Sequence, residues 1–331
     1  RETLVLWDKT TLQSARPAIV WQDRRTVELG FDGERVKQLS GLPLDPYFTS
    51  SKLLWVKRNE PQIWAGVEQG RTAVGTIDSY LIARLSGGRH HITDASNASR
   101  TQLYSLETGD WCDELLSLFE VPRTALPRIV ASYGQLADTM PEAFLGLSLP
   151  ITGIAGDQQA ALFGQCAFDA GDAKCTYGTG AFLLKNTGSE ITHVPDLLTT
   201  VAWQHPNGKR QFAIEGSTFV AGAAVQWLRD GLGIIAEAKD VETLAADTSE
   251  GVLFIPALTG LGAPFWKPEA RGELLGLTRG SNKHHIARAT LDERAADRNT
   301  AQAELAAAQA ALQTARLNLG YTEIEAPISG R

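Results

Sequence analysis

Residues 154–180 read IAGDQQAALFGQ, then CAFDAGDAKC, then TYGTG, and this stretch decides both the fold and the chemistry. Asp157 follows Gly156 at an expected turn, and the small residues after it predict a closely packed helix. Thr179 stands between Gly178 and Gly180, so backbone N–H groups and a hydroxyl can approach phosphate oxygens closely. A proton-accepting carboxylate followed by a phosphate-handling turn indicates phosphoryl transfer to a small alcohol.

Each of these two features also has a more common explanation. Gly-Thr-Gly occurs in many hairpins, and an Asp that follows Gly caps a helix more often than it acts as a base. From this stretch alone, a kinase is one interpretation among several.

The bulk composition excludes several classes of protein. The 331 residues could hold two domains, and 43% hydrophobic with 21% charged residues is ordinary for a soluble globular protein. The net charge of −7 argues against a nucleic-acid partner. We see no apolar run of bilayer-spanning length and no signal peptide, so we expect no membrane partner.

The cysteines indicate the compartment. Cys112, Cys166 and Cys175 are odd in number and lack the spacing of a zinc site, which fits reduced thiols in the cytoplasm. The pairs His90–His91 and His284–His285 are not expected to bind metal, because adjacent residues do not share a helix face and no third ligand follows. We therefore predict a cytoplasmic protein with no metal-ligating residues of its own.

Strands followed by helices along the chain predict an α/β architecture. Short apolar runs predict strands at 4–7, 18–21, 90–93 and 252–256, and hairpins from 175 to 203. Helical spacing predicts helices at 24–39, 51–59, 75–85, 113–119, 160–163 and 219–228.

Several further blocks occur in a fixed order around the opening stretch. They are IVWQDRRT at 19–26, YFTSSKLLWVKRN at 47–59, TDASNASRT at 93–101, AGAAVQWLRD at 221–230, PALTGLGAPFW at 256–266 and GELLGLTRGSNKHHIARATLD at 272–292. With these blocks the chain resembles the FGGY carbohydrate kinases over residues 1–292, and within them the members that act on glycerol. So many independent blocks in the right order make a chance match negligible.

The resemblance implies a ribonuclease-H-like, actin-type fold of two domains, here incomplete. It implies a substrate-side domain at 1–167 and a nucleotide-side domain at 168–292. It further implies ATP-dependent phosphorylation of glycerol to glycerol 3-phosphate, with ATP and Mg²⁺ required. A homo-oligomer is compatible with the sequence.

The resemblance also assigns roles to individual residues. It makes Asp157 the general base, and assigns glycerol binding to Arg1, Glu2, Trp21, Tyr47, Asp157, Gln158 and Phe182. It places Thr179, Gly180, Gly222 and Gln226 against the nucleotide. An Arg–Glu pair suits a diol because it offers charged donors and acceptors together. Without the resemblance, core packing is the simpler explanation for each aromatic residue.

Residues 293–331 differ in kind from the rest. Ala, Gln, Glu and Arg dominate up to residue 318, with Leu305, Leu312 and Leu319 repeating at seven, which predicts a coiled-coil-like helix. The closing LNLGYTEIEAPISGR resembles the periplasmic adaptor (membrane-fusion) proteins of efflux pumps. Because the two resemblances imply different compartments, we interpret the chain as a chimera of a kinase and an adaptor fragment.

Three functions remain in competition at this point. The leading one is phosphorylation of glycerol, and the second is phosphorylation of another polyol or a pentulose by the same family. The third is a non-catalytic interaction protein that works through its coiled-coil tail. Because the phosphate-binding hairpin with which family members begin is not found here, we expect this chain to phosphorylate glycerol poorly or not at all.

Overall fold

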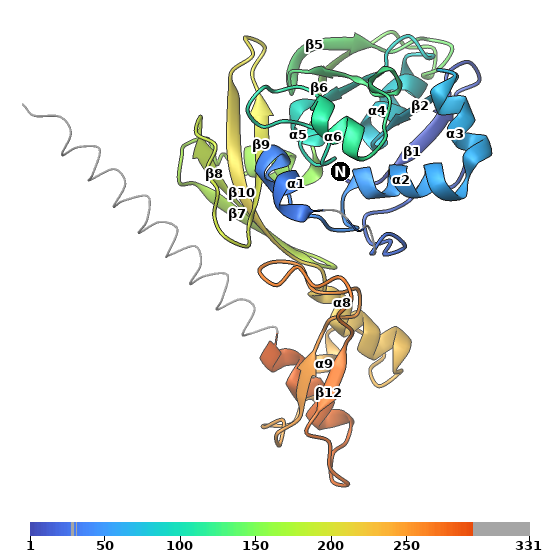
Figure 1. Cartoon of the computed structure of the whole chain (residues 1–331). Coiled ribbons are helices and arrows are strands. Elements are labelled where there is room, and N and C mark those ends of the chain that lie inside the picture. The colour runs from blue at the N-terminus through green and yellow to red at the C-terminus, as the bar shows by residue number, and fades with distance from the viewer. Residues whose placement is uncertain (28–29, 31, 294–331) are drawn as a thin grey trace, which may run out of the picture. The chain divides into compact units, whose positions relative to one another are not determined.

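The structure is a computed structural model that describes residues 1–27, 30 and 32–293 (Figure 1). The chain divides into two compact units. The first unit comprises Arg1–Val220 with Ala257–Gly272, and the second comprises Ala221–Pro256 and the chain from Glu273 onward. The predicted tail helix and strand, from residue 294 on, lie outside the described residues.

The first unit mixes short helices with short strands. Its helices are α1 (Gly33–Ser40), α2 (Thr49–Asn59), α3 (Pro61–Glu68), α4 (Ile77–Leu85), α5 (Ala95–Ala98), α6 (Asp113–Leu118), α7 (Asp157–Gly164) and the 3₁₀ turn η1 (Arg123–Ala125). Its strands are β1 (Val5–Asp8), β2 (Thr72–Gly75), β3 (Ile92–Asp94), β4 (Arg128–Val130), β5 (Tyr133–Asp138), β6 (Pro150–Gly153), β7 (Ala173–Tyr177), β8 (Ala181–Gly188), β9 (Leu198–Gln204) and β10 (Arg210–Thr218).

The largest sheet of the first unit positions the candidate site. It is antiparallel with strand order β7-β8-β10-β9, and β10 lies in the middle (Figure 1). The opposing register pairs Glu215 of β10 with Leu184 of β8 and with Leu198 of β9. A central strand places its alternate side chains in the interior, so a charged residue such as Glu215 is buried there and must find partners.

Smaller strand pairs surround this sheet. β1 pairs antiparallel with β2, β5 antiparallel with β6, and β3 parallel with β4. Helix α5 begins beside β3, where the Asp94 carboxylate caps it by accepting from the N–H groups of Ser96 and Asn97 at 3.0 Å each. These caps explain why a helix of four residues forms at TDASNA.

The main apolar core of the first unit forms where these short elements meet. Its large members include Leu6 of β1, Leu53 of α2 and Trp64 of α3, together with Leu4, Tyr104 and Phe119, which lie outside the named helices and strands. A second cluster joins Leu162 of α7 to Leu184 and Trp203 of the four-stranded sheet. The helix that carries Asp157 is therefore anchored on the sheet that carries Glu215.

The second unit is smaller. Its elements are α8 (Gly222–Gln226), the π-helical turn η2 (Trp227–Gly231), α9 (Asp240–Leu244), β11 (Leu253–Ile255) and β12 (Glu273–Leu275). Its core gathers Val225, Leu228, Ile235, Val241 and Ala287, and Trp227 stacks on Phe254 with ring centroids 5.4 Å apart.

The structure corrects two of the predicted elements. Residues 18–21 form no strand; Ile19 makes only an isolated bridge to Leu4, because β1 takes β2 as its partner. The predicted helix at 24–39 is shorter and begins at Gly33, where Asp32 caps it. Apolar spacing cannot show where a helix starts when a polar turn precedes it.

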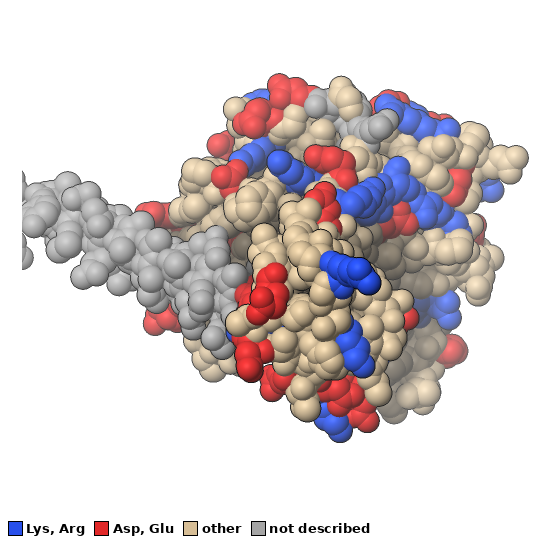
Figure 2. Space-filling model, turned by 90° about the horizontal axis from the view of Figure 1, so that it is seen from below, with Lys and Arg blue, Asp and Glu red and all other residues tan. Residues whose placement is uncertain are grey.

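Surface features agree with the ordinary composition. Figure 2 shows acidic and basic side chains intermixed on one face of the molecule. Among the described residues, no helix is both long enough and apolar enough to cross a bilayer.

Candidate active site

Arg1 lies at the centre of the candidate site and is almost fully buried, with its side chain 2% exposed. Its Nη1 donates to Glu215 Oε2 at 2.7 Å and to Gln159 Oε1 at 3.2 Å. Its Nη2 donates to Glu215 Oε1 at 2.9 Å and to the Tyr47 hydroxyl at 3.2 Å. Its Nε lies 3.3 Å from Glu2 Oε1 and 3.2 Å from Asp157 Oδ1. The guanidinium thus joins the sheet, the loop of Tyr47 and the start of α7.

A second buried arginine completes the charge cluster. Arg100 Nε donates to Glu2 Oε1 at 2.8 Å, and Arg100 Nη2 donates to Glu215 Oε1 at 3.0 Å. The Ser217 hydroxyl also donates to Glu215, at 2.7 Å. Two arginines and two glutamates balance in charge, which is the condition for keeping four ionised groups away from water. We call Arg1, Glu2, Arg100 and Glu215 the buried charge cluster.

The charges in this cluster shift one another's pKa values. Burial alone would raise the pKa of Glu2, but Arg1 and Arg100 outweigh it and lower that pKa to about 2. The pKa of Glu215 is lowered for the same reason, against the opposing effect of its burial. Both carboxylates are therefore ionised at neutral pH and accept hydrogen bonds only.

An aromatic wall stands beside the charge cluster. The Trp21 ring lies edge-on to Tyr47 at 5.7 Å and edge-on to Phe182 at 6.1 Å between centroids. Phe219 extends the wall at 5.2 Å from Tyr47 and 6.0 Å from Trp21. Apolar ring surface next to hydrogen-bonding groups is the arrangement that covers the carbons of a small polyol while polar groups bind its hydroxyls.

A buried lysine stabilises the loop that carries Tyr47 by donating hydrogen bonds to its backbone carbonyls. Lys52 of α2 is fully buried, and its Nζ donates to the carbonyls of Pro46, Tyr47 and Phe48 at 2.8, 2.7 and 3.0 Å. Burial raises the pKa of the Tyr47 hydroxyl, so the hydroxyl keeps its proton and remains a donor. The only hydrogen bond that this hydroxyl makes to a described residue is the one that it accepts from Arg1.

Asp157 is the exposed member of the site. It is the first residue of α7, and its side chain is 69% exposed although its Oδ1 contacts the buried Arg1. The preceding Gly156 allows that approach, since a Cβ there would lie 2.6 Å from Gln159 Oε1 and 2.9 Å from Arg1 Cδ. The Ser96 hydroxyl accepts from the Gly156 N–H at 2.9 Å and fixes the turn.

The hairpin between β7 and β8 brings the second half of the opening stretch to the same place. Thr176 pairs with Phe182 in the ladder, so the turn at 178–180 directly follows the aromatic wall. Thr179 is exposed and Gly180 is buried. A Cβ on Gly180 would lie 2.5 Å from the Thr218 carbonyl oxygen, which explains the glycine there.

Nine of the eleven predicted site residues lie in the first unit. These are Arg1, Glu2, Trp21, Tyr47, Asp157, Gln158, Thr179, Gly180 and Phe182. The other two, Gly222 and Gln226, are the ends of α8 and belong to the second unit. Their place against a nucleotide stays a prediction.

Sequence reasoning missed several residues that contact the site, among them Phe219 of the aromatic wall and Ser217. Glu215 and Arg100 complete the buried charge cluster, Gln159 accepts from Arg1, and Lys174 of β7 donates to Gln158 and Thr176. Glu215 could have been noticed as an acidic residue within a strand of alternating apolar residues. Nothing in the sequence around Arg100 signals its partners.

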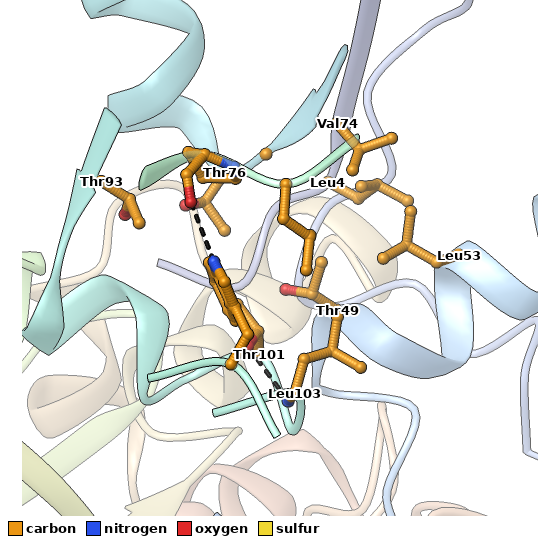
Figure 3. A pocket seen from close by; sticks show the side chains of 12 residues that line it. Leu4, Thr49, Leu53, Val74, Thr76, Thr93, Thr101 and Leu103 are labelled. Carbon is orange, nitrogen blue, oxygen red and sulfur yellow. Dashed lines mark hydrogen bonds between the residues drawn. The ribbon is translucent and has the colours of Figure 1, made fainter. Parts of the chain in front are cut away.

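A small cavity in the core of the first unit is separate from this site. Leu4, Leu53, Val74 and Leu103 line it together with four threonines, as Figure 3 shows. Its volume is about 10 Å³, which is room for about one water molecule. None of the predicted site residues lines it.

Two family models of known proteins match this chain. The profile of the N-terminal domain of the FGGY family of carbohydrate kinases matches residues 1–164, and that of the C-terminal domain matches residues 173–315. This chain belongs to the FGGY family of carbohydrate kinases. The second match extends past residue 292, and the likeness of the tail to an adaptor protein stays a prediction.

Individual relatives point in the same direction. The chain is 50% identical over 301 residues to a glycerol kinase of Bdellovibrio bacteriovorus, in a match that covers 88% of this chain and 61% of the relative. It is 51% identical over 301 residues to a glycerol kinase of Acinetobacter baylyi, covering 88% of this chain and 60% of the relative. This chain therefore spans about three fifths of the length of the relatives that it matches.

Solved structures support the fold of this FGGY kinase chain. It superposes on glycerol kinase of Plasmodium falciparum with ADP at a TM-score of 0.73 and 36% identity, covering 88% of this chain and 60% of that one. It superposes on a xylulose kinase from Lactobacillus acidophilus at a TM-score of 0.69 and 23% identity, covering 88% and 60%, which shows the fold alone. The predicted actin-type α/β fold is confirmed.

Proposed function

We propose that this chain carries the polyol-binding and proton-accepting site of a glycerol kinase, which phosphorylates glycerol from ATP to give glycerol 3-phosphate. The observation that carries the proposal is the contact of Arg1 with both Asp157 and Tyr47 beside the aromatic wall. Identity of about half the residues to glycerol kinases supports glycerol over a pentulose.

In this proposal the binding groups divide by chemistry. The rings of Trp21 and Phe182 cover the glycerol carbons, and the Tyr47 hydroxyl donates its free proton to a glycerol oxygen. Arg1 has five N–H donors, and described residues already engage all its nitrogens. The main role of Arg1 is therefore to hold Asp157 and Tyr47 in place. A glycerol oxygen can bind Arg1 only by sharing one of its N–H groups with Asp157 or Tyr47.

Asp157 accepts the proton of the hydroxyl that is phosphorylated. The glycerol oxygen forms a bond to the γ-phosphorus as the bond to the β–γ bridging oxygen breaks, and the hydroxyl proton passes to the Asp157 carboxylate. The exposed position of Asp157 allows this carboxylate to meet both substrates, while Arg1 keeps Oδ1 in place. Thr179 and Gly180 contact the nucleotide phosphates in this proposal. Gly222 and Gln226, which belong to the second unit, are proposed for the nucleotide on the resemblance alone.

The residues present fit a Mg²⁺ ion that is held mainly by the nucleotide. No group of three or more His, Cys, Asp or Glu side chains among the described residues could hold a metal by itself. Kinase Mg²⁺ is usually bound by substrate phosphates with one or two carboxylates, and Asp157 offers one exposed carboxylate. The ion would neutralise charge on the γ-phosphate when bound.

We also propose that the protein acts in the cytoplasm. All three cysteines are free, and Cys166 and Cys175 are exposed, which fits a reducing compartment. Glycerol and ATP are the proposed partners, and a homo-oligomer remains compatible with the sequence.

The test measures binding and transfer on the purified chain. Glycerol binding is followed by calorimetry, and transfer of labelled γ-phosphate from Mg²⁺–ATP is followed with glycerol and with xylulose as acceptors. Asp157→Asn should lower transfer to glycerol by about 10²- to 10⁴-fold and leave glycerol affinity within a few-fold. Asp169→Asn, an exposed aspartate outside the site, is the matched control.

Three outcomes would contradict the proposal. One is a chain that binds no glycerol, and another is a faster transfer to xylulose than to glycerol. The third is a transfer rate that Asp157→Asn leaves unchanged. A low absolute rate that still depends on Asp157 would agree with the assigned role.

A further inference from the structure

Lys174 is a buried lysine that touches three parts of the site at once. It lies on β7, is 7% exposed, and its Nζ donates to the Gln158 side-chain oxygen. It also donates to Thr176 Oγ1 at 3.0 Å and to the Phe182 carbonyl at 3.4 Å. An ammonium group has three donors, and these three acceptors use all of them.

This contact fixes how the Gln158 amide is turned. A lysine can only donate, so the amide atom that faces Lys174 must be the oxygen, Oε1. The Gln158 nitrogen then faces the other way, and it donates to Asp157 Oδ2 at 3.3 Å. A flipped amide would present its oxygen to the carboxylate, which is a repulsive contact.

Asp157 is consequently held from two sides. Arg1 Nε lies 3.2 Å from one carboxylate oxygen, and the Gln158 amide donates to the other. The second amide hydrogen of Gln158 stays available for a substrate hydroxyl. Lys174 also ties the Phe182 backbone, so it connects the base, its amide neighbour and the aromatic wall.

We propose that Lys174 is a positioning residue for phosphoryl transfer, which turns the Gln158 amide so that its NH₂ group orients Asp157 and the substrate hydroxyl. The inference rests on the proposed function and deepens it. Lys174 is not a catalytic residue in this scheme, since its three donors are occupied by protein acceptors and none remains for a phosphate oxygen.

The main test compares two replacements of Lys174, one that keeps the length of the side chain without its charge and one that keeps the charge. Lys174→Met keeps the length but removes the donors, and should lower kcat/KM for glycerol by about 10- to 100-fold. Lys174→Arg restores charged donors and should recover part of the loss. Lys185→Met on β8 is the matched control, because Lys185 is equally buried at 6% exposed and its side chain makes no hydrogen bond to a described residue.

A double-mutant comparison tests whether Lys174 acts through Gln158. In a Gln158→Ala background, Lys174→Met should cause little further loss, because there is no amide left to orient. Lys174→Met should lower the unfolding midpoint modestly, because three acceptors lose their donor while a buried charge is removed. kcat/KM is therefore measured at temperatures well below that midpoint.

The pH profile gives a readout that a purely structural lysine would not move. Burial is the main cause that lowers the pKa of Lys174 to about 8, and the positive charge of Arg1 lowers it further. The negative charges of Glu215 and Asp157 act in the opposite direction and raise it. kcat/KM should therefore decline above about pH 8 in the wild type and less steeply in Lys174→Arg. Cys175→Ser controls for the neighbouring thiol, which also raises the pKa of Lys174.

The outcomes separate this inference from the proposed function. If the unmodified chain neither binds nor phosphorylates glycerol, the proposed function fails, and the inference fails with it. If it does so and Lys174→Met keeps full kcat/KM, or loses no more than Lys185→Met, the inference alone is overturned. Additive losses with Gln158→Ala would likewise overturn it.

Discussion

The buried charge cluster and the turn at 178–180 lie in the same unit but are built in opposite ways. Glu215 and Arg100 have 0% exposed side chains and bond to several protein groups each, whereas Thr179 is exposed and its hydroxyl bonds no described residue. The proposed polyol side is thus held together by its own ion pairs and hydrogen bonds, and the proposed phosphate side leaves the Thr179 hydroxyl to a ligand. A substitution should therefore cost stability on the first side and ligand affinity on the second.

Among these variants, Glu215→Gln is expected to cause the largest loss of unfolding free energy. This change removes the charge that both buried arginines share, and breaking a buried pair costs about 3–5 kcal/mol of unfolding free energy. Urea unfolding of both proteins measures the difference. Glu114→Gln is the control, because its pair with Arg35 is about half exposed on both sides and should be worth at most about 1 kcal/mol. If both variants lose the same small amount of unfolding free energy, the buried charge cluster does not contribute to stability as proposed.

Glu2 should make the same cluster sensitive to acid. Its pKa is about 2 in the folded chain against 4.5 ordinarily, so the unfolded chain takes up the proton first as pH falls. The stabilisation is present above about pH 4.5, amounts to about 3 kcal/mol, and is lost between pH 4.5 and 2. The difference in unfolding free energy between wild type and Glu2→Gln should shrink over that window. A difference that stays constant with pH would contradict the assignment; Glu142→Gln, at an exposed position, is the control.

Lys52→Met should destabilise the loop of Tyr47 by an intermediate amount. It leaves three carbonyls in the interior without their donor, and an unsatisfied buried polar group costs about 1–3 kcal/mol, partly offset by removing a buried charge. We expect a net loss of about 2 kcal/mol in thermal or urea unfolding, together with weaker glycerol binding. Lys57→Met, on the exposed side of the same helix, should stay within about 1 kcal/mol. A Lys52→Met variant as stable as wild type would show that the loop is held by other contacts.

Thr179→Ala should have the smallest effect on stability and a selective effect on binding. Because Thr179 is exposed, the unfolding free energy should stay within about 0.5 kcal/mol of wild type. Loss of a hydroxyl that contacts a charged phosphate should weaken ATP binding about tenfold, with glycerol affinity unchanged. Calorimetric titrations with each ligand measure both. Equal losses for glycerol and ATP would mean that the turn does not belong to the phosphate side.

Local pattern was enough to predict several elements and the family. Helical spacing in 51–59, 75–85 and 113–119 predicted α2, α4 and α6 with errors of at most two residues at each end. Helices α4 and α6 bury only part of their residues, so their spacing reflects their packing, whereas α2 is buried over most of its length. Ordered motif blocks identified the family because each block is locally complete. The roles of Asp157, Tyr47 and the other site residues stay predictions, although nine of them lie in the first unit.

The partners inside the site could not be predicted in the same way. Glu215 is one acidic residue in a nine-residue strand, and its partners Arg1 and Arg100 lie 214 and 115 positions away. Lys174 looks like an ordinary surface residue of an alternating strand, yet the sheet turns it inward. Such pairings follow from the order of strands in the sheet, and local spacing carries no information about that order.

The ion pair between Arg1 and Glu215 can form only late during synthesis of the chain. The two residues are 214 positions apart, so Arg1 emerges from the ribosome long before β10 exists. At 5–20 residues per second, roughly 10–40 seconds pass before its partner is available. During that delay β1 can already pair with β2, which lies fewer than eighty positions away. The buried charge cluster is therefore completed late on the ribosome, well after the strand that follows Arg1 has found its neighbour.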